Sequence, residues 1–349
     1  MLLIHAAVCY QDLLGDTRYE PLLRDQVESL VREIDASPHG LLDDYPGQCF
    51  PSDVIAALAA IRRADRLLGT DHGEFLTRSL RGFQGGLVDD RTGLPPYMAD
   101  SKGGHATEAR GSTSQWACAW APLVWPDKAS EWYRAFETHF WQTRWGAVGL
   151  REFTREQAES EWTFDVDAGP VLGGFAVATT AFGIGAARMN GRFDDAYPLS
   201  AETIALSWPL PDGTLLLPRI LSRGLGSPYV GEAAILYNLT RQLAEGMPKV
   251  RGGTLPAVVF GVLGLLLVRV MMDVWSTWRQ WHQIETWIGQ RTFWWPRVQW
   301  GLWLLLTLSG LWIFFSGDLI VGLLVVCSSQ LLPLGRRISG PGQPTPGRS

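Results

Sequence analysis

The sequence has few cysteines and lacks the short motifs that mark common metal and cofactor sites. Four cysteines occur in 349 residues, and no two of them have CxxC spacing, which argues against a zinc knot and a disulfide scaffold. A P-loop, an HExxH motif and a GxSxG motif are all missing, and Gly183 and Gly185 lack the third glycine of a dinucleotide fingerprint. We therefore expect neither a metal ion nor a cofactor.

Acidic residues outnumber basic ones in the first 250 residues. The whole chain has 30 lysines and arginines against 35 aspartates and glutamates, and its formal net charge is -5 at pH 7. From Arg251 onward the basic residues outnumber the acidic ones, so the preceding part is the more acidic. Nucleic-acid binding needs a basic face, and we therefore expect no nucleic-acid partner.

The last hundred residues contain three apolar runs. Residues 255–272 carry one charge, and residues 298–315 and 319–334 carry none. A transmembrane helix needs roughly 17–25 mostly apolar residues, so the first two runs qualify, the third is marginal, and the last two predict a membrane hairpin. Nine of the 17 tryptophans lie between Trp275 and Trp312, as expected at a membrane boundary, and residues 274–296 predict an interfacial helix.

These runs predict an integral, multi-pass membrane protein with the lipid bilayer as a partner. Arginines in residues 273–297 and in the tail favour a cytoplasmic tail and an external helical domain. Met1, however, opens directly into a helix that has neither a basic segment nor a cleavage site. The side of the membrane on which the helical domain lies therefore stays open.

A helical unit that ends in a Gly-Leu pair recurs along the first 250 residues. The pairs are Gly40–Leu41, Gly93–Leu94 and Gly149–Leu150, with a looser copy at Gly213–Thr214–Leu215. Such a period indicates stacked copies of one supersecondary unit. The unit is a helical hairpin, and a long polar loop follows each pair, so we expect all the long loops at one end of the molecule, where a site would lie.

Short turns separate the two helices of each hairpin. Leu13–Leu14–Gly15 and Leu67–Leu68–Gly69 each predict a helix end, because glycine adopts the left-handed conformation that helix ends favour. The helix SEWYRAFETHFWQTRW is expected to run through Trp145, and the apolar segment GPVLGGFAVATTAFGIGAAR predicts a helix that begins at Gly169. Its glycines are expected to permit close helix packing.

The predicted fold is all-α, an (α/α) toroid of helical hairpins over residues 1–250. A membrane region with two to three transmembrane helices follows over residues 251–335, and a disordered tail over 336–349. Four hairpins and one further helix are fewer than a closed ring of α-hairpins usually has. We therefore expect an incomplete ring, with one or two hairpins missing before Met1.

The first long loop, DDYPGQCFPSD, gathers polar side chains within a short stretch. Asp44 and Tyr45 have no evident structural role and are predicted to be catalytic. Cys49 is expected to line the substrate site, although a free cysteine is more often a buried small apolar residue. Asp53 is expected to cap the following helix.

The second loop, residues 95–116, contains Tyr97 and His105. His105 follows two glycines in a stretch without an apolar pattern, and its near-neutral titration suits proton transfer. Tyr97 is expected to contact substrate. Cys118 follows in a helix that is apolar nearly all round, which predicts a place inside the ring and possible contact with substrate.

The third loop, residues 151–170, carries four carboxylates: Glu159, Glu161, Asp165 and Asp167. Carboxylates that converge raise one another's pKa, which keeps a general acid protonated at neutral pH. Asp165 is predicted to be catalytic, and Glu161 and Asp167 to bind substrate. The alternative for Asp167 is a helix cap ahead of Gly169 and Pro170.

Three segments together resemble the linalool dehydratase/isomerase-like α/α-barrel family: DDYPGQCFPSD, ARGSTSQW and DVDAGPVLGGFAVATTAFGIGAARMNGRFD. The resemblance covers roughly residues 1–245. It implies an (α/α) toroid and cofactor-free elimination of water from, and isomerisation of, a monoterpene alcohol by Asp, His, Tyr and Cys side chains. Asp44, Tyr45 and His105 match such positions. The close cysteine pair of the family is not evident, since Ser112 stands in the ARGS segment and Cys118 stands alone.

A second segment, QWACAWAP, is similar to a helix of trehalase-like (α/α)6 glycosidases, which carry an aspartate where this chain has Ala117. Inverting glycosidases need two opposed carboxylates, and Asp44 with Glu161 or Asp165 would be the candidates. Our preferred interpretation is a membrane-anchored, cofactor-independent lyase or isomerase that acts on a lipophilic or terpenoid alcohol. The alternatives are a glycoside hydrolase and a non-catalytic membrane-bound binding domain.

Overall fold

A computed structural model gives the fold. It describes residues 1–83, 87–102, 106–156, 161–210, 214–224, 226–227, 229–279, 295–316 and 319–329. The chain divides into two compact units. One comprises Met1–Trp208 with Leu215–Val258, and the other Pro209–Thr214 with Val259–Ser349.

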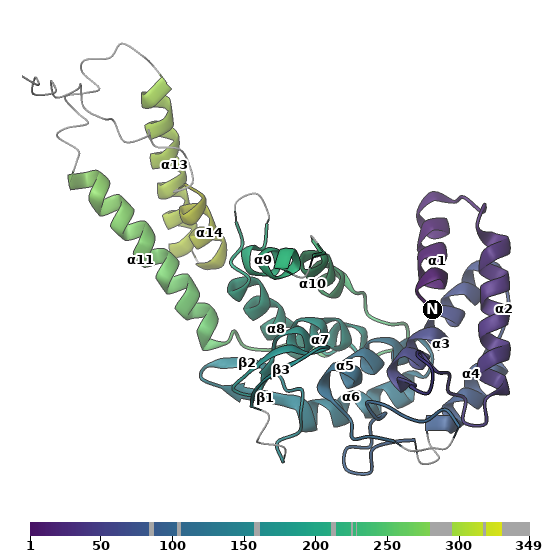
Figure 1. Ribbon diagram of the computed structural model, residues 1–349. Helices are drawn as coiled ribbons and strands as arrows, with labels where there is room; N and C mark the ends of the chain where they lie inside the picture. The colour runs from purple at the N-terminus through teal and green to yellow at the C-terminus, as the bar shows by residue number, and fades with distance from the viewer. Residues whose placement is uncertain are drawn as a thin grey trace, which may run out of the picture. The chain divides into compact units, whose positions relative to one another are not determined.

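The first unit is mostly helical (Figure 1). Its α-helices are α1 Leu2–Leu14, α2 Glu20–Ala36, α3 Pro51–Leu68, α4 Gly73–Leu80, α5 Gly111–Trp120, α6 Pro126–Phe140, α7 Val177–Met189, α8 Phe193–Leu206, α9 Leu216–Gly224 and α10 Val230–Thr240. Two short 3-10 helices, η1 Arg81–Phe83 and η2 Ala121–Leu123, extend α4 and α5.

These helices pair into hairpins, as the repeat predicts. The helices α1, α3, α5, α7 and α10 form a row in which each contacts the next, and α2, α6, α8 and α9 pack against members of that row. Every residue of α5 except Trp116 is buried, including the polar residues of its first half. We call the five helices of this row the inner helices; α3, α5 and α7 are the most buried of them.

The sequence signals at the helix ends act as expected. Gly15 and Gly69 end α1 and α3 in the left-handed conformation, with φ of 64° and 66°. Proline opens α3 and α6, where its missing N–H has no partner to lose. In α7, a Cβ on Gly185 would lie 2.1 Å from Asn238 Oδ1. The α7 glycines thus allow the close helix packing that was predicted.

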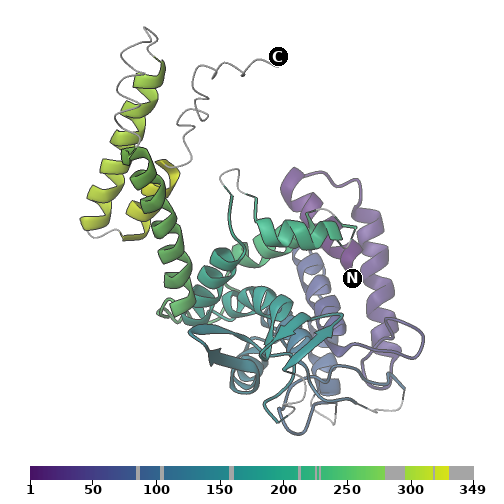
Figure 2. The same ribbon diagram turned by 60° about the vertical axis from the view of Figure 1, so that its left-hand side comes forward.

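Five short strands correct the all-α prediction. β1 Trp141–Arg144 and β2 Ala147–Leu150 form one antiparallel pair, and β3 Trp162–Asp165, β4 Gly169–Leu172 and β5 Phe175–Ala176 form a three-stranded sheet. Figure 2 shows the strands beside α7. The helix expected through Trp145 therefore ends at Phe140, and the helix expected from Gly169 begins at Val177.

Glycines at positive φ explain these two differences. Trp145 and Gly146 have φ of 55° and 75° and turn the chain between β1 and β2. Gly173 and Gly174, at 59° and 87°, turn it between β4 and β5. A Cβ on Gly173 would lie 2.3 Å from the Trp145 ring. Such a backbone does not continue a helix.

The segment that follows α10 runs back along the turn between α7 and α8. Ala244 N–H donates to Met189 O over 3.2 Å, Val250 N–H to Gly191 O over 2.8 Å, and Phe193 N–H to Val250 O over 3.1 Å. Val258 N–H then donates to Gly146 O in the β1–β2 turn over 3.0 Å. The segment 244–258 is thus bonded to two turns of the first unit.

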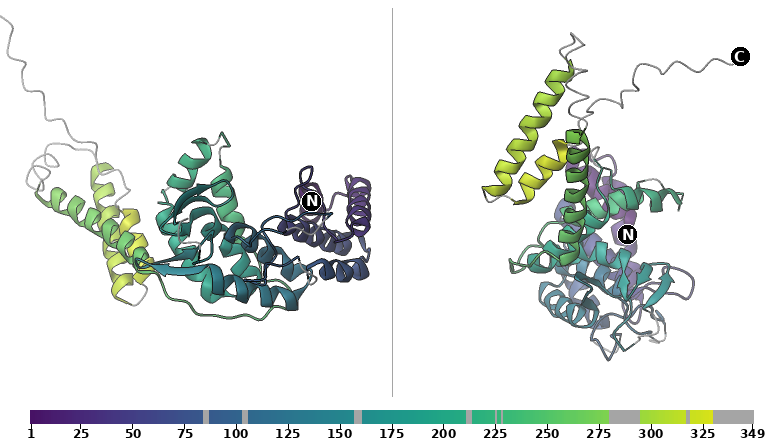
Figure 3. Two further views of the ribbon diagram at one scale, coloured as in Figure 1. Left: turned by 60° about the horizontal axis from the view of Figure 1, so that its bottom comes forward. Right: turned by 90° about the vertical axis from the view of Figure 1, so that its left-hand side faces the viewer.

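The second unit contains α11 Ala257–Arg279, which starts in the first unit, together with α13 Trp295–Phe315 and α14 Leu319–Ser329. Figure 3 shows α13 and α14 side by side. Gly310 allows the contact, since a Cβ there would lie 2.8 Å from Val326. The helices α13 and α14 cover most of the two apolar runs, residues 298–315 and 319–334, that predict a membrane hairpin.

Within the described residues, one helix is long and apolar enough to cross a membrane, Ala257–Ser276. The apolar stretch Trp300–Ile313 of α13 is shorter, so the expected second and third spans stay predictions. Of the expected interfacial helix 274–296, α11 covers the first residues as far as Arg279, and residues 280–294 lie outside the described part, as does the tail 336–349.

Candidate functional site

The first two long loops meet at the amino-terminal ends of the inner helices. Cys49 N–H donates to Ala99 O over 3.3 Å, and Ala99 N–H donates to Cys49 O over 3.0 Å. Ser101 Oγ donates to Asp43 Oδ1 over 2.5 Å. Because these bonds join the loop before α3 to the loop before α5, the side chains of the two loops share one end of the unit, as the repeat predicts.

Asp53, in the first turn of α3, is half-buried beneath these loops. It is not the expected cap, because its Oδ1 accepts a hydrogen bond from Trp116 Nε1 in α5 over 3.0 Å. Burial, followed by the charge of Asp44 and further by that of Asp167, raises the pKa of Asp53 to about 6. Asp53 is therefore a carboxyl group that holds a proton at mildly acidic pH.

Asp44 lies at the exposed rim of the same site. Its Oδ2 accepts a hydrogen bond from Phe50 N–H over 2.9 Å. Partial desolvation by the surrounding protein raises its pKa, and the neighbouring Asp43 adds to this effect. The charge of Asp44 in turn helps to raise the pKa of Asp53.

The third loop joins the site through Tyr97 and Arg110. Tyr97 Oη donates to Asp167 Oδ2 over 3.0 Å, and Arg110 Nη1 donates to Asp165 Oδ2 over 3.1 Å. The Arg110 guanidinium lies 4.2 Å from the centre of the Tyr97 ring. Burial and the charge of Asp167 raise the pKa of Tyr97 to about 12, so its hydroxyl stays a proton donor. We call Asp44, Asp53, Asp165 and Asp167 the carboxylate cluster.

Aromatic rings lie beside the carboxylate cluster. Phe50 packs edge-on against Tyr97, with ring centres 5.5 Å apart, and Tyr45 packs edge-on against Phe50 at 6.4 Å. Tyr45 itself is exposed, and its hydroxyl bonds to no other described residue. The predicted catalytic Tyr45 is therefore part of an aromatic rim, whereas Tyr97 makes the contacts to a carboxylate.

A buried carboxylate behind the cluster has no counterpart in the sequence-based prediction. Glu152 is fully buried and accepts hydrogen bonds from Ser112 N–H over 2.8 Å, from Ser112 Oγ over 2.7 Å and from Thr179 Oγ1 over 3.1 Å. Burial raises its pKa to about 7, although the bonds from Ser112 oppose the shift. Glu152 thereby ties the start of α5 to α7.

Glycine makes this tie possible. A Cβ on Gly111 would lie 1.9 Å from Arg151 O, so only a residue without a side chain fits where α5 begins. Gly111 N–H donates to Glu152 O over 2.9 Å. The one sequence signal for Glu152 is its place two residues after the third Gly-Leu pair, at the start of a long loop.

Of the other predicted site residues, Glu161 and Cys118 lie away from the cluster, and Cys49 lies beside it but is buried. Glu161 pairs with Arg144 over 2.9 Å at the opposite end of β3 from Asp165. Cys118 is fully buried in the carboxy-terminal half of α5, and burial raises its pKa. Cys49 is also buried, which raises its pKa to about 12, so both thiols fill space. His105 and Glu159 lie outside the described residues.

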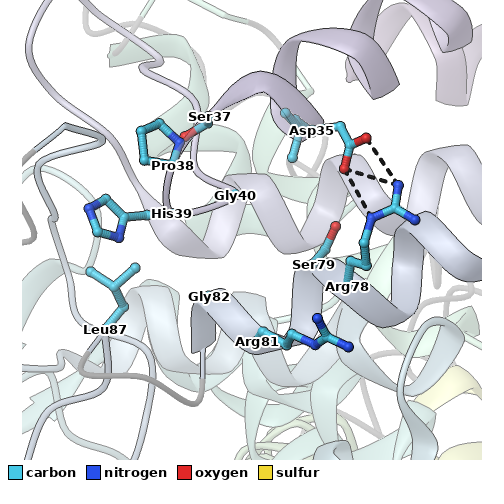
Figure 4. Close-up of a pocket in the computed structure, with 11 residues that line it drawn as sticks. Asp35, Ser37, Pro38, His39, Gly40, Arg78, Ser79, Arg81, Gly82 and Leu87 are labelled. Atoms are coloured by element: carbon cyan, nitrogen blue, oxygen red, sulfur yellow. Dashed lines mark hydrogen bonds and ion pairs between the residues drawn. The ribbon is translucent and has the colours of Figure 1, made fainter.

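Two cavities lie elsewhere in the first unit. The smaller, about 280 Å³, lies where α2 and α4 end, and Figure 4 shows Arg78 and Asp35 paired beside it, with Arg78 Nη2 3.0 Å from Asp35 Oδ2. None of the predicted site residues lines it. The larger, about 580 Å³, lies at the carboxy-terminal ends of the inner helices, opposite to the end at which the carboxylate cluster lies.

Among the described residues, no group of three His, Cys, Asp or Glu side chains is arranged to hold a metal ion. Comparisons with protein-family models and with curated proteins give no match. The function of the site therefore has to be inferred from its own chemistry.

Proposed function

We propose that the carboxylate cluster is the acid–base site of a cofactor-independent lyase or isomerase that acts on a lipophilic alcohol. The main support is Asp53, a half-buried carboxyl group whose pKa of about 6 lets it carry a proton. A general acid works best when its pKa lies near the working pH. Aromatic rings beside it, Phe50 and Tyr97, suit an apolar substrate better than a sugar.

The chemistry follows from these groups. Asp53 donates its proton to the hydroxyl oxygen of the substrate as the C–O bond breaks, and water leaves. A carboxylate on the other side of the substrate, Asp44 or Asp167, accepts a proton from the adjacent carbon, and the electron pair of that C–H bond forms the new double bond. The aromatic faces stabilise positive charge that develops on carbon. In the reverse direction, addition of water at another carbon gives the isomerised alcohol.

The resemblance to the linalool dehydratase/isomerase-like family is consistent with this proposal. The row of inner helices backed by outer helices is the arrangement from which an (α/α) toroid is built. In that arrangement the loops at one end form the site, and the carboxylate cluster comes from three such loops. The chemistry proposed here depends on Asp53 and on Asp44 or Asp167, and requires no cysteine pair.

Membrane anchoring by α11 is part of the proposal, with α13 and α14 as a further membrane hairpin. The β3–β4 hairpin of the first unit supports it. Trp162 pairs with Leu172 across the strands and Phe164 with Pro170, so these four side chains share one face. Trp162 and Phe164 are 66% and 69% exposed. An exposed aromatic face of this kind suits a membrane interface, and Asp165 lies on the opposite face of the hairpin.

A label on this face should be quenched by lipid. In protein with Cys9 and Cys327 replaced by serine, we expect a fluorescent label on Phe164→Cys to be quenched by nitroxide-bearing lipids in nanodiscs. A label on Thr163→Cys, which points to the other face, should be quenched much less. A label on Leu265→Cys in α11, quenched by the same lipids, shows whether α11 is anchored in the membrane. Quenching at Leu265 but equal, weak quenching at positions 163 and 164 would mean that the hairpin does not touch lipid.

The proposed reaction is tested directly with the full chain in nanodiscs. Monoterpene and longer isoprenoid alcohols are incubated with the protein, and dehydrated and isomerised products are measured by gas chromatography and mass spectrometry. We expect turnover by the wild-type protein and background levels with a variant that combines Asp53→Asn and Asp167→Asn. Hydrolysis of glycosides without any alcohol turnover would instead favour a glycosidase, and binding without turnover a binding domain.

A further inference from the structure

The larger cavity lies at the end of the helices where the connecting turns are short. Its wall comes from the carboxy-terminal halves of α1, α3, α5 and α7 and from the end of α10 and the residues after it, at residues such as Val8, Arg63, Trp120, Met189 and Arg241. Its volume, about 580 Å³, falls in the range of roughly 300–1,000 Å³ that is usual for small-molecule sites. The cavity is therefore large enough for a small organic ligand.

A buried cation forms part of this wall. Arg241 is only 8% exposed, and its Nη2 donates to the carbonyl oxygen of Ala119 over 2.6 Å. It also bonds to the hydroxyl of Tyr237 and stacks on Trp120, 4.2 Å from the ring centre. None of the described carboxylates forms an ion pair with it. Buried charges are normally paired, so Arg241 presents a positive charge that the protein itself does not neutralise.

A second cation faces the same space. Arg63 Nη1 lies 3.4 Å from His5 Nδ1, its Nη2 lies 3.5 Å from Cys9 Sγ, and Asp12 is 3.9 Å away at the margin of an ion pair. Burial lowers the pKa of Arg241, and the charge of Arg63 lowers it further. The two guanidinium groups are thus close enough to repel each other, and an anion between them would relieve this repulsion.

The neighbouring His5 is affected by the positive charges of Arg63 and Arg241. His5 stacks on Trp120 with ring centres 4.5 Å apart. Burial, followed by the charge of Arg63 and further by that of Arg241, lowers the pKa of His5 to about 4. His5 is therefore neutral at physiological pH, and its Nε2 is buried without a hydrogen-bond partner among the described residues.

The two carboxylates that line the cavity lie on its outside. Asp12 and Glu245 are both exposed to solvent, whereas Arg241 lies inside. Val8, Leu123 and Met189 supply apolar surface to the same wall. The interior thus combines positive charge with an apolar wall, and the acidic groups face the solvent at the rim.

We propose that this cavity binds an anionic amphiphile, with an oxyanion head between Arg63 and Arg241 and a short apolar body against Val8, Leu123 and Met189. Carboxylates and phosphate monoesters share the required head chemistry, because a guanidinium group forms paired hydrogen bonds to either. The site lies at the opposite end of the helices from the carboxylate cluster, so it is separate from the proposed reaction.

The test is calorimetric titration of the full chain in nanodiscs of zwitterionic lipid, with empty nanodiscs as the blank. Hexanoate and hexyl phosphate are the probes, and hexanol is the uncharged match. We expect saturable binding of at least one anion, and binding of hexanol at least roughly tenfold weaker, as expected when a charge-assisted hydrogen bond is lost. The tighter of the two anions identifies carboxylate or phosphate as the preferred head.

Variants of α3 complete the test. Arg63→Gln should weaken binding of the anion roughly tenfold, whereas Arg62→Gln, an exposed neighbour outside the cavity, should leave it unchanged. Arg66→Gln, in the same wall and solvent-exposed, should weaken binding by less and serves if Arg63→Gln does not fold. Absence of saturable binding, equal binding of hexanol, or unchanged affinity in both cavity variants overturns the proposal. None of these readouts depends on alcohol turnover.

Discussion

Replacing Asp53 with Asn should lower kcat of the proposed elimination by roughly a hundred- to ten-thousand-fold, the usual contribution of a general acid. Asn keeps the volume of the side chain, and its amide oxygen still accepts the hydrogen bond that Trp116 donates to Asp53. The variant therefore removes the proton and little else. Product formation is measured under single-turnover conditions, so that slow product release does not hide the effect.

The pH profile gives an independent measure of the same group. Because the pKa of Asp53 is about 6, its protonated form is lost as the pH rises through that value. We therefore expect kcat/KM of the wild-type protein to fall with increasing pH above about 6, and the Asn variant to lack this limb. A profile that rises through the same interval would assign Asp53 the role of a base.

Asp127→Asn is the matched control for Asp53→Asn. Asp127 also lies in the first turn of a helix that opens with proline, α6, but it is exposed and distant in sequence from the three loops. Its replacement should leave turnover unchanged. If Asp53→Asn is as active as Asp127→Asn, the carboxylate cluster does not use Asp53 as its acid.

Replacing Glu152 with Ala should destabilise the first unit by roughly 3 kcal/mol or more, since each buried polar group left without a partner costs about 1–3 kcal/mol. The groups left behind are Ser112 N–H, Ser112 Oγ and Thr179 Oγ1. For a domain of this size we expect Tm to fall by roughly 6–12 °C. Thermal unfolding at pH about 5.5, where Glu152 is neutral in the folded protein, measures the loss of these hydrogen bonds.

Glu152 also gives a defined pH dependence of stability. The pKa of Glu152 is about 7 in the folded protein, compared with 4.5 for a glutamate free of its surroundings. The folded state therefore binds the proton more tightly, and the free energy of unfolding decreases as pH rises from 4.5 to 7, by about 3 kcal/mol in total. Above pH 7 the carboxyl is ionised in both states, and its contribution no longer changes.

Glu152→Gln separates the hydrogen bonds from the ionisation. Its amide oxygen still accepts from Ser112, so the loss at pH 5.5 should be much smaller than for Glu152→Ala, and the part of the decrease between pH 4.5 and 7 that Glu152 causes should disappear. His5, whose lowered pKa makes stability fall as pH drops from 6.5 to 4, acts in the opposite direction in both proteins. The difference between wild type and variant therefore isolates Glu152. A pH-independent difference would contradict the proposed ionisation.

The helical hairpins follow from local sequence, whereas the strands do not. Gly15 and Gly69 end helices because a left-handed residue closes a helix in any context, and prolines open them. Residues 141–144 contain no glycine or proline that would end α6, yet they pair with 147–150 because Trp145 and Gly146 turn the chain. Whether residues 141–144 form a strand or continue the helix depends on their backbone pairing with residues 147–150, and the local preference of either segment is weak.

The candidate site also has a part that the sequence predicts and a part that it does not. Convergence of Asp44, Tyr97, Asp165 and Asp167 at one end was predictable, because stacked hairpins place equivalent loops together. The roles of Asp53 and Glu152 were not, since Asp53 depends on Trp116 and Glu152 on Ser112 and Thr179. These partners lie 27 to 63 positions away in sequence, and no local pattern relates them.

The bonds that hold segment 244–258 have a mechanical consequence. Tension on the chain at α11 would load the bond from Val258 to Gly146 first, and next the bonds that link Val250 to Gly191 and Phe193. The latter run side by side along the segment and would resist such a pull in shear. Force that enters the protein through its apolar helix would thus be borne at the α7–α8 turn and the β1–β2 turn, and would spare α3 and the carboxyl group of Asp53.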